Sequence, residues 1–420
     1  MFTRHSPGEL QLFRFGSVIF VLLLTVTSTT FSQYLELRRS IIEKLARNGF
    51  ENLKVRVDGN RAAISYENRV YRFDVEALRE VLKLVVPHLN RQSVIVLVPC
   101  NRQIPLVSVA VSVSDCKEYF NARMSGTMFA QRLRIDLDTG EIERELSDEE
   151  AENSSSLHLD IAVKPQVSFQ FGPYAHPVTS QINAVPELQT SWFKGMHANA
   201  EVIVPVVNEF GPRGDNVRPG VLALNQVYRF SGNTFVSASA GIFTQDRYGL
   251  DVEAEKYAWN GNLSYGFNAG FSSMLFFERM ASIVYSDKFA LTGSVHCNYR
   301  VSQYDLTLGV MAGKFLGGDK SLRFDMKREF GEFEIGFFGI HAFGGITNGG
   351  INITIPLYPS KYRNPGVVRV RSREDFTMSY LAKTNADQLI GLRYNTLNRL
   401  EYFDKKLNPD FIKNYFSITN

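Results

Sequence analysis

The feature that most constrains this chain is an alternation of apolar and polar residues that recurs between about Leu157 and Leu381. The clearest example is residues 321–330, where Leu322, Phe324 and Met326 alternate with Arg323, Asp325 and Lys327. Successive side chains of a β-strand point to opposite faces, so this period predicts strands with one apolar and one polar face. A soluble sandwich buries the apolar face, whereas a membrane barrel turns it to lipid and keeps the charged face in its lumen.

The first 33 residues have the pattern of a secretory signal peptide. Arg4 and Arg14 precede an apolar run at residues 18–26, and a small, polar stretch follows at residues 27–33. This order is typical of a cleavable signal, and the run is shorter than the roughly 20 apolar residues that a spanning helix needs. We therefore expect an exported chain, and a membrane anchor helix is the disfavoured alternative. Since no later segment is apolar enough to span as a helix, a barrel is the membrane architecture that the sequence allows.

The alternating region divides into fourteen candidate strands of about the length that a tilted transmembrane strand requires. Turn residues such as Ser231-Gly232-Asn233 separate them. The candidates include residues 367–381 and residues 275–286; the latter alternate poorly and are alternatively a hairpin or a bulged strand. The sequence therefore predicts a mainly β protein, an antiparallel transmembrane β-barrel of about 12–16 strands over residues 157–381. An even number of strands is expected, because the domain before the barrel and the tail after it are both predicted to be periplasmic.

Residues 34–135 predict a small periplasmic α/β domain in the order helix, strand, strand, helix, strand, strand. Within it, Asp58-Gly59-Asn60 is a strong hairpin signal. Residues 136–156 are acidic and rich in serine, which is typical of a solvated linker, and they lack the ligand spacing of a calcium loop. Residues 382–420 are predicted to be a C-terminal periplasmic tail, which either packs beneath the barrel, plugs its lumen or binds a partner.

Composition narrows the class of function. A net charge of +3 over 420 residues gives no basic footprint, so we expect no nucleic-acid partner. The mean hydropathy of −0.13 suits a barrel with a polar lumen. Cys100 and Cys116 are close enough in sequence to form a disulfide in an oxidising periplasm, and the sequence leaves open whether they are bonded.

No catalytic, cofactor or metal site is predicted. His296 lies beside Ser294 on a predicted lumenal face, but a nucleophile and base at this spacing lack an orienting third group. A barrel enzyme that acts on lipid or glycan therefore remains an alternative only. The candidate contacts for a sugar chain or a partner are the charged lumenal residues Asp251, Glu253, Glu255, Arg323, Asp325 and Lys327, together with Asp319 in a glycine turn. The same charges would alternatively pair between strands and make the barrel rigid.

Residues 312–357 carry a family resemblance. Ala-Gly-Lys-Phe-Leu-Gly-Gly-Asp-Lys-Ser at 312–321 is followed by Arg-Glu-Phe-Gly at 328–331, Gly-Phe-Phe at 336–338 and Ile-Pro-Leu at 355–357. This order resembles the YjbH-type exopolysaccharide-production proteins of Gram-negative bacteria, of which the chain would be a short member.

The resemblance implies a non-enzymatic outer-membrane barrel that acts in exopolysaccharide production or secretion. The implied partners are outer-membrane lipid and either a polysaccharide or the polysaccharide-export machinery. An outer-membrane adaptor of a secretion or motility apparatus has a similar architecture and remains a second alternative.

Overall fold

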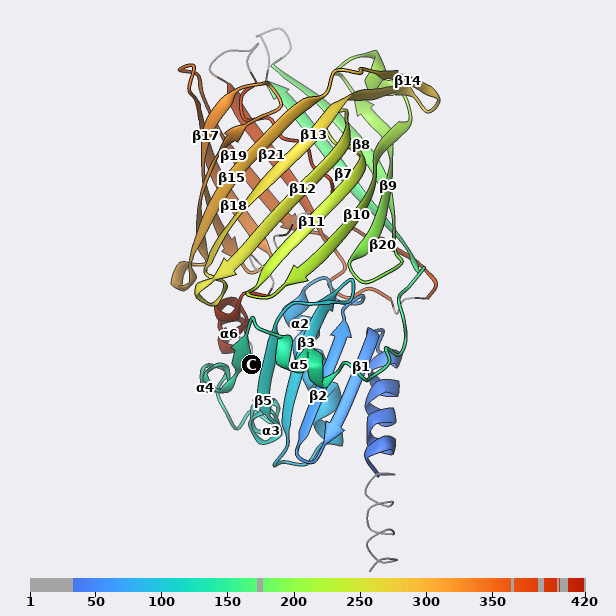
Figure 1. Cartoon of the computed structure of the whole chain (residues 1–420), viewed down its shortest axis with the longest axis vertical. Coiled ribbons are helices and arrows are strands. Elements are labelled where there is room, and N and C mark those ends of the chain that lie inside the picture. The colour runs from blue at the N-terminus through green and yellow to red at the C-terminus, as the bar shows by residue number, and fades with distance from the viewer. Residues whose placement is uncertain are drawn as a thin grey trace, which may run out of the picture.

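The computed structural model describes residues 33–171, 177–363, 366–383, 389–398, 400 and 407–418. Apart from Gln33, the predicted signal peptide lies outside these residues. The described chain forms a smaller α/β domain and a large curled sheet, which lie one above the other (Figure 1). Among the described residues, no helix is long and apolar enough to cross a membrane.

The α/β domain begins with a helix over residues 33–47 and is built on a 6-stranded sheet. Its further elements are β1 (Glu51–Asp58), β2 (Arg61–Glu67), α2 (Asp74–Val85), η1 (Val86–His88), β3 (Val94–Asn101), β4 (Ile104–Pro105), β5 (Ser108–Ser112), α3 (Val113–Phe120), α4 (Gly126–Arg132), β6 (Arg134–Asp136) and α5 (Gly140–Glu145). The predicted hairpin is confirmed, since β1 pairs with β2 across Gly59, whose φ is 53°. Helices α3, α4 and α5 are absent from the predicted order of elements.

The predicted linker at residues 136–156 is folded onto the domain. Ile142 of α5 and Leu146 are buried against one face of the 6-stranded sheet, and Glu145 forms an ion pair with Arg61 of β2. Leu53 also forms a backbone bridge with Glu152. The expectation of a solvated linker is therefore wrong, because two apolar residues among many acidic ones are enough to bury one side of the segment.

The second region, here called the barrel sheet, has 15 described strands. They are β7 (Leu159–Phe171), β8 (Val178–Ser191), β9 (Met196–Asn208), β10 (Arg218–Phe230), β11 (Thr234–Phe243), β12 (Arg247–Ala258), β13 (Leu263–Arg279), β14 (Ser282–Tyr285), β15 (Ala290–Val301), β16 (Leu306–Lys314), β17 (Lys320–Phe330), β18 (Phe333–Ala342), β19 (Thr347–Pro356), β20 (Val368–Ser372) and β21 (Asp375–Lys383). Single turns lie at η2 (Pro212–Asp215), η3 (Trp259–Gly261) and η4 (Ser302–Tyr304), and the last helix is α6 (Pro409–Ile418). The mainly β, antiparallel prediction is confirmed.

The two faces of the barrel sheet are inverted relative to a soluble protein. Phe324 of β17 is 52% exposed on the outer face, whereas Glu253 of β12 is 7% exposed on the inner face. Other apolar side chains around the sheet, such as Leu250 and Val295, are exposed in the same way. In water, a wall with apolar side chains exposed outside and carboxylates buried inside is unfavourable. In a lipid environment the same arrangement is favourable.

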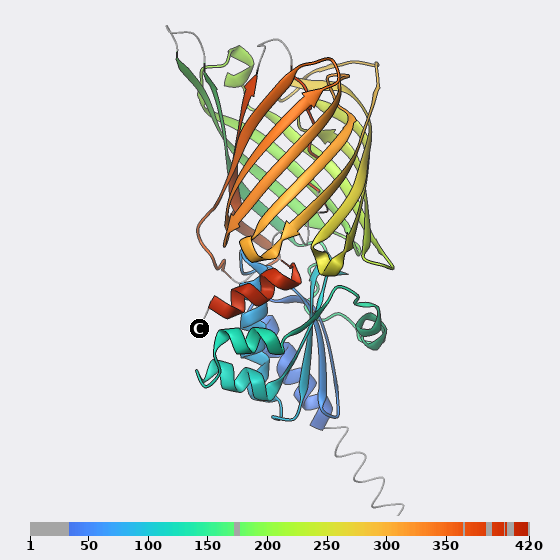
Figure 2. The ribbon, with the colours of Figure 1, turned by 90° about the vertical axis from the view of Figure 1, so that its left-hand side faces the viewer.

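The barrel sheet curls round so that its two ends approach each other (Figure 2), but no ladder among the described residues joins β21 to β7. Instead, β20 pairs with the lower half of β7 in parallel, from Val368 opposite Leu159 to Ser372 opposite Val163. Farther up, the rings of Phe171 and Tyr380 lie 5.3 Å apart, edge to face. The structure therefore has the curvature of the predicted barrel without a hydrogen-bonded closure.

Two predicted strands differ from the structure. Residues 275–286 are not a crossing strand; β13 extends to Arg279 and forms a short hairpin with β14. The predicted strand at 367–381 is broken at Arg373 and Glu374 into β20, which pairs with β7, and β21, which pairs with β19.

The expectation of an even number of strands is wrong for the described sheet. Thirteen strands alternate in direction from β7 to β21, not counting β14 and β20. With this odd number, β21 runs away from the α/β domain, as β7 does. The tail nevertheless ends beside the domain, because it returns through the interior of the barrel sheet.

The α/β domain and the rim of the barrel sheet next to it share one apolar core. Phe235 of β11, Tyr257 of β12 and Phe416 of α6 belong to the same buried cluster as Leu78 of α2. Helix α6 lies between the barrel sheet and helix α4 (Figures 1 and 2). We call this rim the domain-side rim and the opposite one the far rim.

Candidate functional site

The interior of the barrel sheet is the candidate site, and it contains the tail. Residues 389–398 form no helix or strand, yet half of them are buried. Their contacts move steadily from the far rim to the domain-side rim. The structure therefore meets two of the alternatives left open by the sequence, since residues 389–398 lie within the lumen and α6 packs beneath the barrel sheet.

At the far rim the tail binds the turn between β16 and β17. The backbone N–H of Gly391 donates to Asp319 Oδ2 at 2.9 Å, and the N–H of Leu316 donates to the carbonyl of Leu392 at 3.1 Å. Ile390 packs on Ile340 of β18. Gly391 has a φ of 67°, and a Cβ there would press on Ile340, so this position favours glycine.

Tyr394 anchors the middle of the tail. Its ring stacks on Phe243 with centroids 5.2 Å apart and an interplanar angle of 13°. Its hydroxyl donates to Asp251 Oδ2 at 2.6 Å, and Asn268 Nδ2 donates to the same carboxylate at 2.9 and 3.0 Å. A Cβ at Gly270 would overlap the Tyr394 hydroxyl, so the absence of a side chain there creates the space that the tyrosine occupies.

At the domain-side rim the tail meets the α/β domain. Asn398 donates to Ser237 of β11 and accepts from Arg102 Nη1 at 2.9 Å. Arg102 lies in the turn between β3 and β4, and its carbonyl accepts from the N–H of Gly195 at 2.8 Å. The tail is therefore held by both regions of the molecule.

Helix α6 completes the attachment. Asp410 Oδ2 accepts from Asn262 at 2.6 Å and from Ser302 at 2.8 Å. A Cβ at Gly126 of α4 would overlap the backbone carbonyl of Phe416, so the two helices are in close backbone contact.

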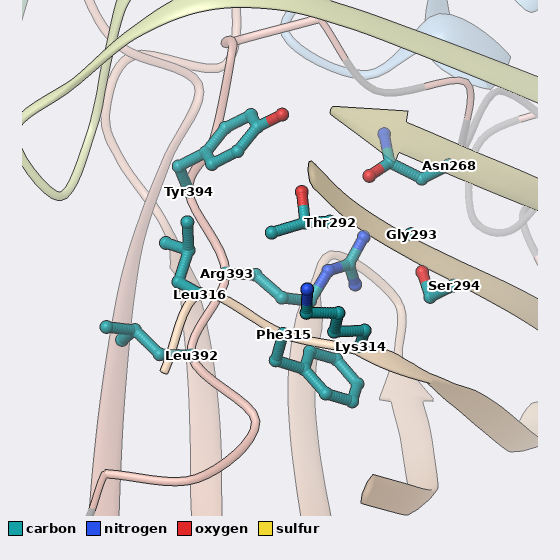
Figure 3. Close-up of a pocket in the computed structure, with 10 residues that line it drawn as sticks. All are labelled: Asn268, Thr292, Gly293, Ser294, Lys314, Phe315, Leu316, Leu392, Arg393 and Tyr394. Atoms are coloured by element: carbon teal, nitrogen blue, oxygen red, sulfur yellow. The ribbon is translucent and has the colours of Figure 1, made fainter. Parts of the chain in front are cut away.

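With the tail in place, little open space is left beside it. A cavity of about 20 Å³ lies between tail residues Leu392–Tyr394 and inner-wall residues that include Thr292, Ser294 and Lys314 (Figure 3). A space of this size holds about one water molecule.

The predicted lumenal charges do lie on the inner face, and most of them have partners there. Arg323 donates to Asp325 at 2.7 to 3.0 Å and covers the ring of Phe338 at 4.1 Å. Glu255 pairs with His296. Glu253 and Lys327 also interact with neighbouring groups. These contacts favour the pairing role over a free ligand site.

Asp251 and Asp319 have a different role, because both accept hydrogen bonds from the tail. The sequence marked the two carboxylates as contacts but did not identify their partner. It missed Ile390, Gly391, Tyr394 and Asn398 as site residues. The one signal for them was the frequency of aromatic and aliphatic residues in the tail, which a solvated segment would not need.

The structure shows no assembled catalytic group around His296. Its Nε2 is occupied by Glu255, and its Nδ1 has no hydrogen-bond partner among the described residues. Ser294 lines the small cavity instead. Within the described chain, no group of three His, Cys, Asp or Glu side chains is arranged to hold a metal ion.

The disulfide that the sequence left open is not formed. Both Cys100 and Cys116 are free cysteines, and they face opposite sides of the 6-stranded sheet, since Cys116 belongs to the large core and Cys100 packs beside Ile142. Burial raises the pKa of the Cys116 thiol to about 12 and that of Cys100 further still. Buried neutral thiols of this kind are inert.

Polar contacts also join the α/β domain to the domain-side rim. Arg72 donates to both carboxylate oxygens of Glu332, at 2.6 and 2.7 Å, in the turn between β17 and β18. The hydrogen bond from Glu332 raises the pKa of Arg72. Arg229 of β10 donates to the carbonyls of Leu106 and Leu137 in the domain.

Comparisons with known proteins give one family match. A family model described as "Exopolysaccharide biosynthesis protein YbjH" (YjbH) matches residues 25–360. Among solved structures, a loop L8 deletion mutant of OmpT, an outer membrane protein of Vibrio cholerae, aligns with 47% of this chain and 86% of its own, at 8% identity and a TM-score of 0.25. A search of curated proteins found no match. The family match ends at residue 360, before β20, β21 and the tail.

Proposed function

Because the chain belongs to the YjbH family of exopolysaccharide biosynthesis proteins, we propose that it is an outer-membrane accessory that serves exopolysaccharide production without catalysing a reaction. The α/β domain lies in the periplasm, and the barrel sheet crosses the outer membrane. The observation that carries this proposal is the inverted wall, with Phe324 and Leu250 exposed outside and Glu253 buried inside, which suits lipid on one side and a polar interior on the other.

The filled interior supports a docking role over that of a permanently open conduit. The tail is bonded to Asp319 at the far rim, to Asp251 in the middle and to Arg102 of the domain. The domain therefore contacts the interior of the barrel sheet directly. In this proposal the domain engages the polysaccharide-export machinery, and the barrel sheet places that assembly at the outer membrane.

Deletion of the gene tests the proposal. We expect the deletion strain to lose surface polysaccharide, measured as total carbohydrate in washed-cell extracts, and a copy of the full chain to restore it. Separation of the membranes should place the protein in the outer-membrane fraction. An unchanged polysaccharide coat in the deletion strain would rule out this function.

Two controls separate the alternatives. Complementation with a Ser294→Ala/His296→Ala variant should restore the polysaccharide fully, and its failure to do so with normal protein levels would favour a barrel enzyme. Protein secretion and surface motility are measured in the same deletion strain. Loss of either one with a normal polysaccharide coat would favour the adaptor of a secretion or motility apparatus.

A further inference from the structure

Three polar side chains on the inner wall have buried atoms without a hydrogen-bond partner among the described residues. Both ring nitrogens of His197, both amide atoms of Asn199 and the Nδ2 of Asn225 make no hydrogen bond within the described chain. Their exposed fractions are 1%, 3% and 0%, respectively. Buried polar atoms are nearly always hydrogen-bonded in folded proteins, so three such residues together need an explanation.

The three residues form one patch, which we call the polar strip. His197 of β9 lies directly opposite Asn225 of β10, and Asn199 follows His197 on the same face. Asn225 in turn lies opposite Ser239 of β11, whose hydroxyl donates to the Asn225 Oδ1 at 2.6 Å. Residues opposite each other on one face of a sheet have Cβ atoms about 5 Å apart, so the strip is continuous.

The tail passes beside this strip without satisfying it. Leu397 packs in the apolar cluster that contains Ala223, and Ala223 lies directly opposite Asn199. The side-chain amide of Asn398 instead donates to Ser237 and accepts from Arg102. Among the described tail residues, the neighbours offered to the strip are therefore an aliphatic side chain and an amide that is bonded elsewhere.

The same tail behaves differently nearer the far rim. There it donates hydrogen bonds to Asp319 and to Asp251, and Tyr394 fills a space left by a glycine. Leaving a buried polar group without a partner is unfavourable, whereas water or a polar ligand satisfies it. The described tail thus donates hydrogen bonds to the wall nearer the far rim, where, of the two contacted carboxylates, only Asp319 keeps an unpaired oxygen, its Oδ1, and it donates none to the polar strip.

We propose that the polar strip is a binding subsite for a neutral, hydroxyl-rich chain, a segment of glycan, which takes the place of Leu397 and Asn398. This inference rests on the proposed function for its choice of ligand class. Each amide offers a donor and an acceptor, and a neutral imidazole does the same, as does each sugar hydroxyl. The carboxylates that adjoin the strip, Glu201 and Asp251, are already bonded to Lys164 and to Tyr394. The groups that the strip itself offers are uncharged, so it matches a neutral chain rather than a cation. Arg102, released from Asn398, adds a further donor.

The test measures how accessible the tail is to a thiol-reactive label. Thr396, which is buried, is changed to cysteine (Thr396→Cys) in the full chain, and the native cysteines are changed to alanine (Cys100→Ala, Cys116→Ala, Cys297→Ala). The purified protein in detergent micelles is labelled with a maleimide. Two probes are added separately: maltoheptaose, and neutral oligosaccharides released from the host's own exopolysaccharide by partial hydrolysis.

We expect at least one probe to accelerate labelling by about fivefold or more, the factor that corresponds to about 1 kcal/mol in an equilibrium. In His197→Phe and Asn199→Leu variants the acceleration should disappear. The same two variants should have a raised Tm, because each removes an unsatisfied buried group. An Asn268→Leu variant is the matched control: it loses the bonds to Asp251, so its Tm should fall while the acceleration persists.

Labelling that neither probe accelerates would overturn the proposal, as would acceleration that survives in both strip variants. A lowered Tm for both strip variants would show that these side chains have partners, and would also overturn it. The outcome is independent of the deletion experiment. A normal polysaccharide coat in the deletion strain rules out the proposed function, even if maltoheptaose accelerates the labelling of the tail cysteine.

Discussion

The α/β domain and the barrel sheet use the same residue types in opposite places. In the domain, Leu78 and Phe50 are fully buried, and the charged residues that are buried, such as Glu51 and Glu67, lie outside its apolar core. In the barrel sheet, Asp251 and Glu253 are buried and Phe324 is exposed. The comparison shows that alternation alone specifies a strand with two unlike faces, and that the surroundings decide which face is inside. The two regions nevertheless meet in one shared core at the domain-side rim.

The largest expected effect comes from placing the same charge in each region. Leu78→Arg puts an unpaired cation in the domain core and should destabilise the domain by more than about 4 kcal/mol. Phe324→Arg should cost about 2–4 kcal/mol in a bilayer, and Phe324→Leu should be nearly neutral. Urea titrations of the protein in phosphatidylcholine vesicles measure these differences. If Phe324→Arg were also neutral in vesicles, the outer face would not be in contact with lipid.

Removing the central anchor of the tail should affect the barrel sheet next. Tyr394→Ala loses the stack on Phe243 and the bond to Asp251, at a cost of about 3 kcal/mol, as for other buried aromatic residues. Planar-bilayer recordings should show ion conductance in this variant and little in the wild type. Gly270→Ala displaces the same hydroxyl with a single methyl group, so it should conduct as well. Equal conductance in all three proteins would mean that the tail does not close the lumen.

A smaller effect is expected at the junction between the two regions. Arg72→Ala removes two charge-assisted hydrogen bonds to Glu332, which corresponds to about 1–2 kcal/mol for a partly exposed acceptor. A double-mutant cycle with Glu332→Gln, followed by thermal unfolding, isolates the pair. Arg39→Ala, which breaks an exposed pair with Glu43, is the control and should leave the Tm unchanged. A coupling energy near zero would mean that the junction depends on its apolar core alone.

The smallest effect is expected for the thiols of Cys100 and Cys116, which should not form a disulfide under oxidising conditions. At pH 8 the Cys116 thiol, whose pKa burial raises to about 12, stays protonated and should resist iodoacetamide in the folded protein. Cys100 should resist as well, and both should react after unfolding in guanidinium chloride. Peptide mass spectrometry counts the adducts. A cross-linked Cys100–Cys116 peptide from the folded protein would contradict the placement of the two residues on opposite faces of the sheet.

The wall of the barrel sheet could be predicted from the sequence because each of its strands has one apolar outer face and one polar inner face. The alternation at Leu322–Lys327 is a local pattern, and it predicted correctly which side chains face inward. Residues 367–381 were misassigned because a break interrupts the strand without changing the composition. For residues 275–286, the poor alternation left a hairpin as an alternative, and the structure has that hairpin. The linker was misassigned because its packing depends on Ile142 and Leu146, two residues in an acidic stretch.

The path of the tail could not be predicted, because its contacts are distant in sequence and individually ordinary. Gly391 meets Asp319 and Tyr394 meets Asp251, over separations of 72 and 143 residues. No local period marks such a segment, since it forms no strand or helix over residues 389–398. The candidate carboxylates were therefore identified from the sequence, and the chain that occupies them was not.

The return of the tail through the barrel sheet has a mechanical consequence. Helix α6 is seated against α4 beside the domain, while the strand that precedes the tail, β21, ends at the far rim. The covalent chain thus links the base of the molecule to its opposite edge along the central axis. The domain is therefore attached to the near rim through the shared core and to the opposite rim through the tail.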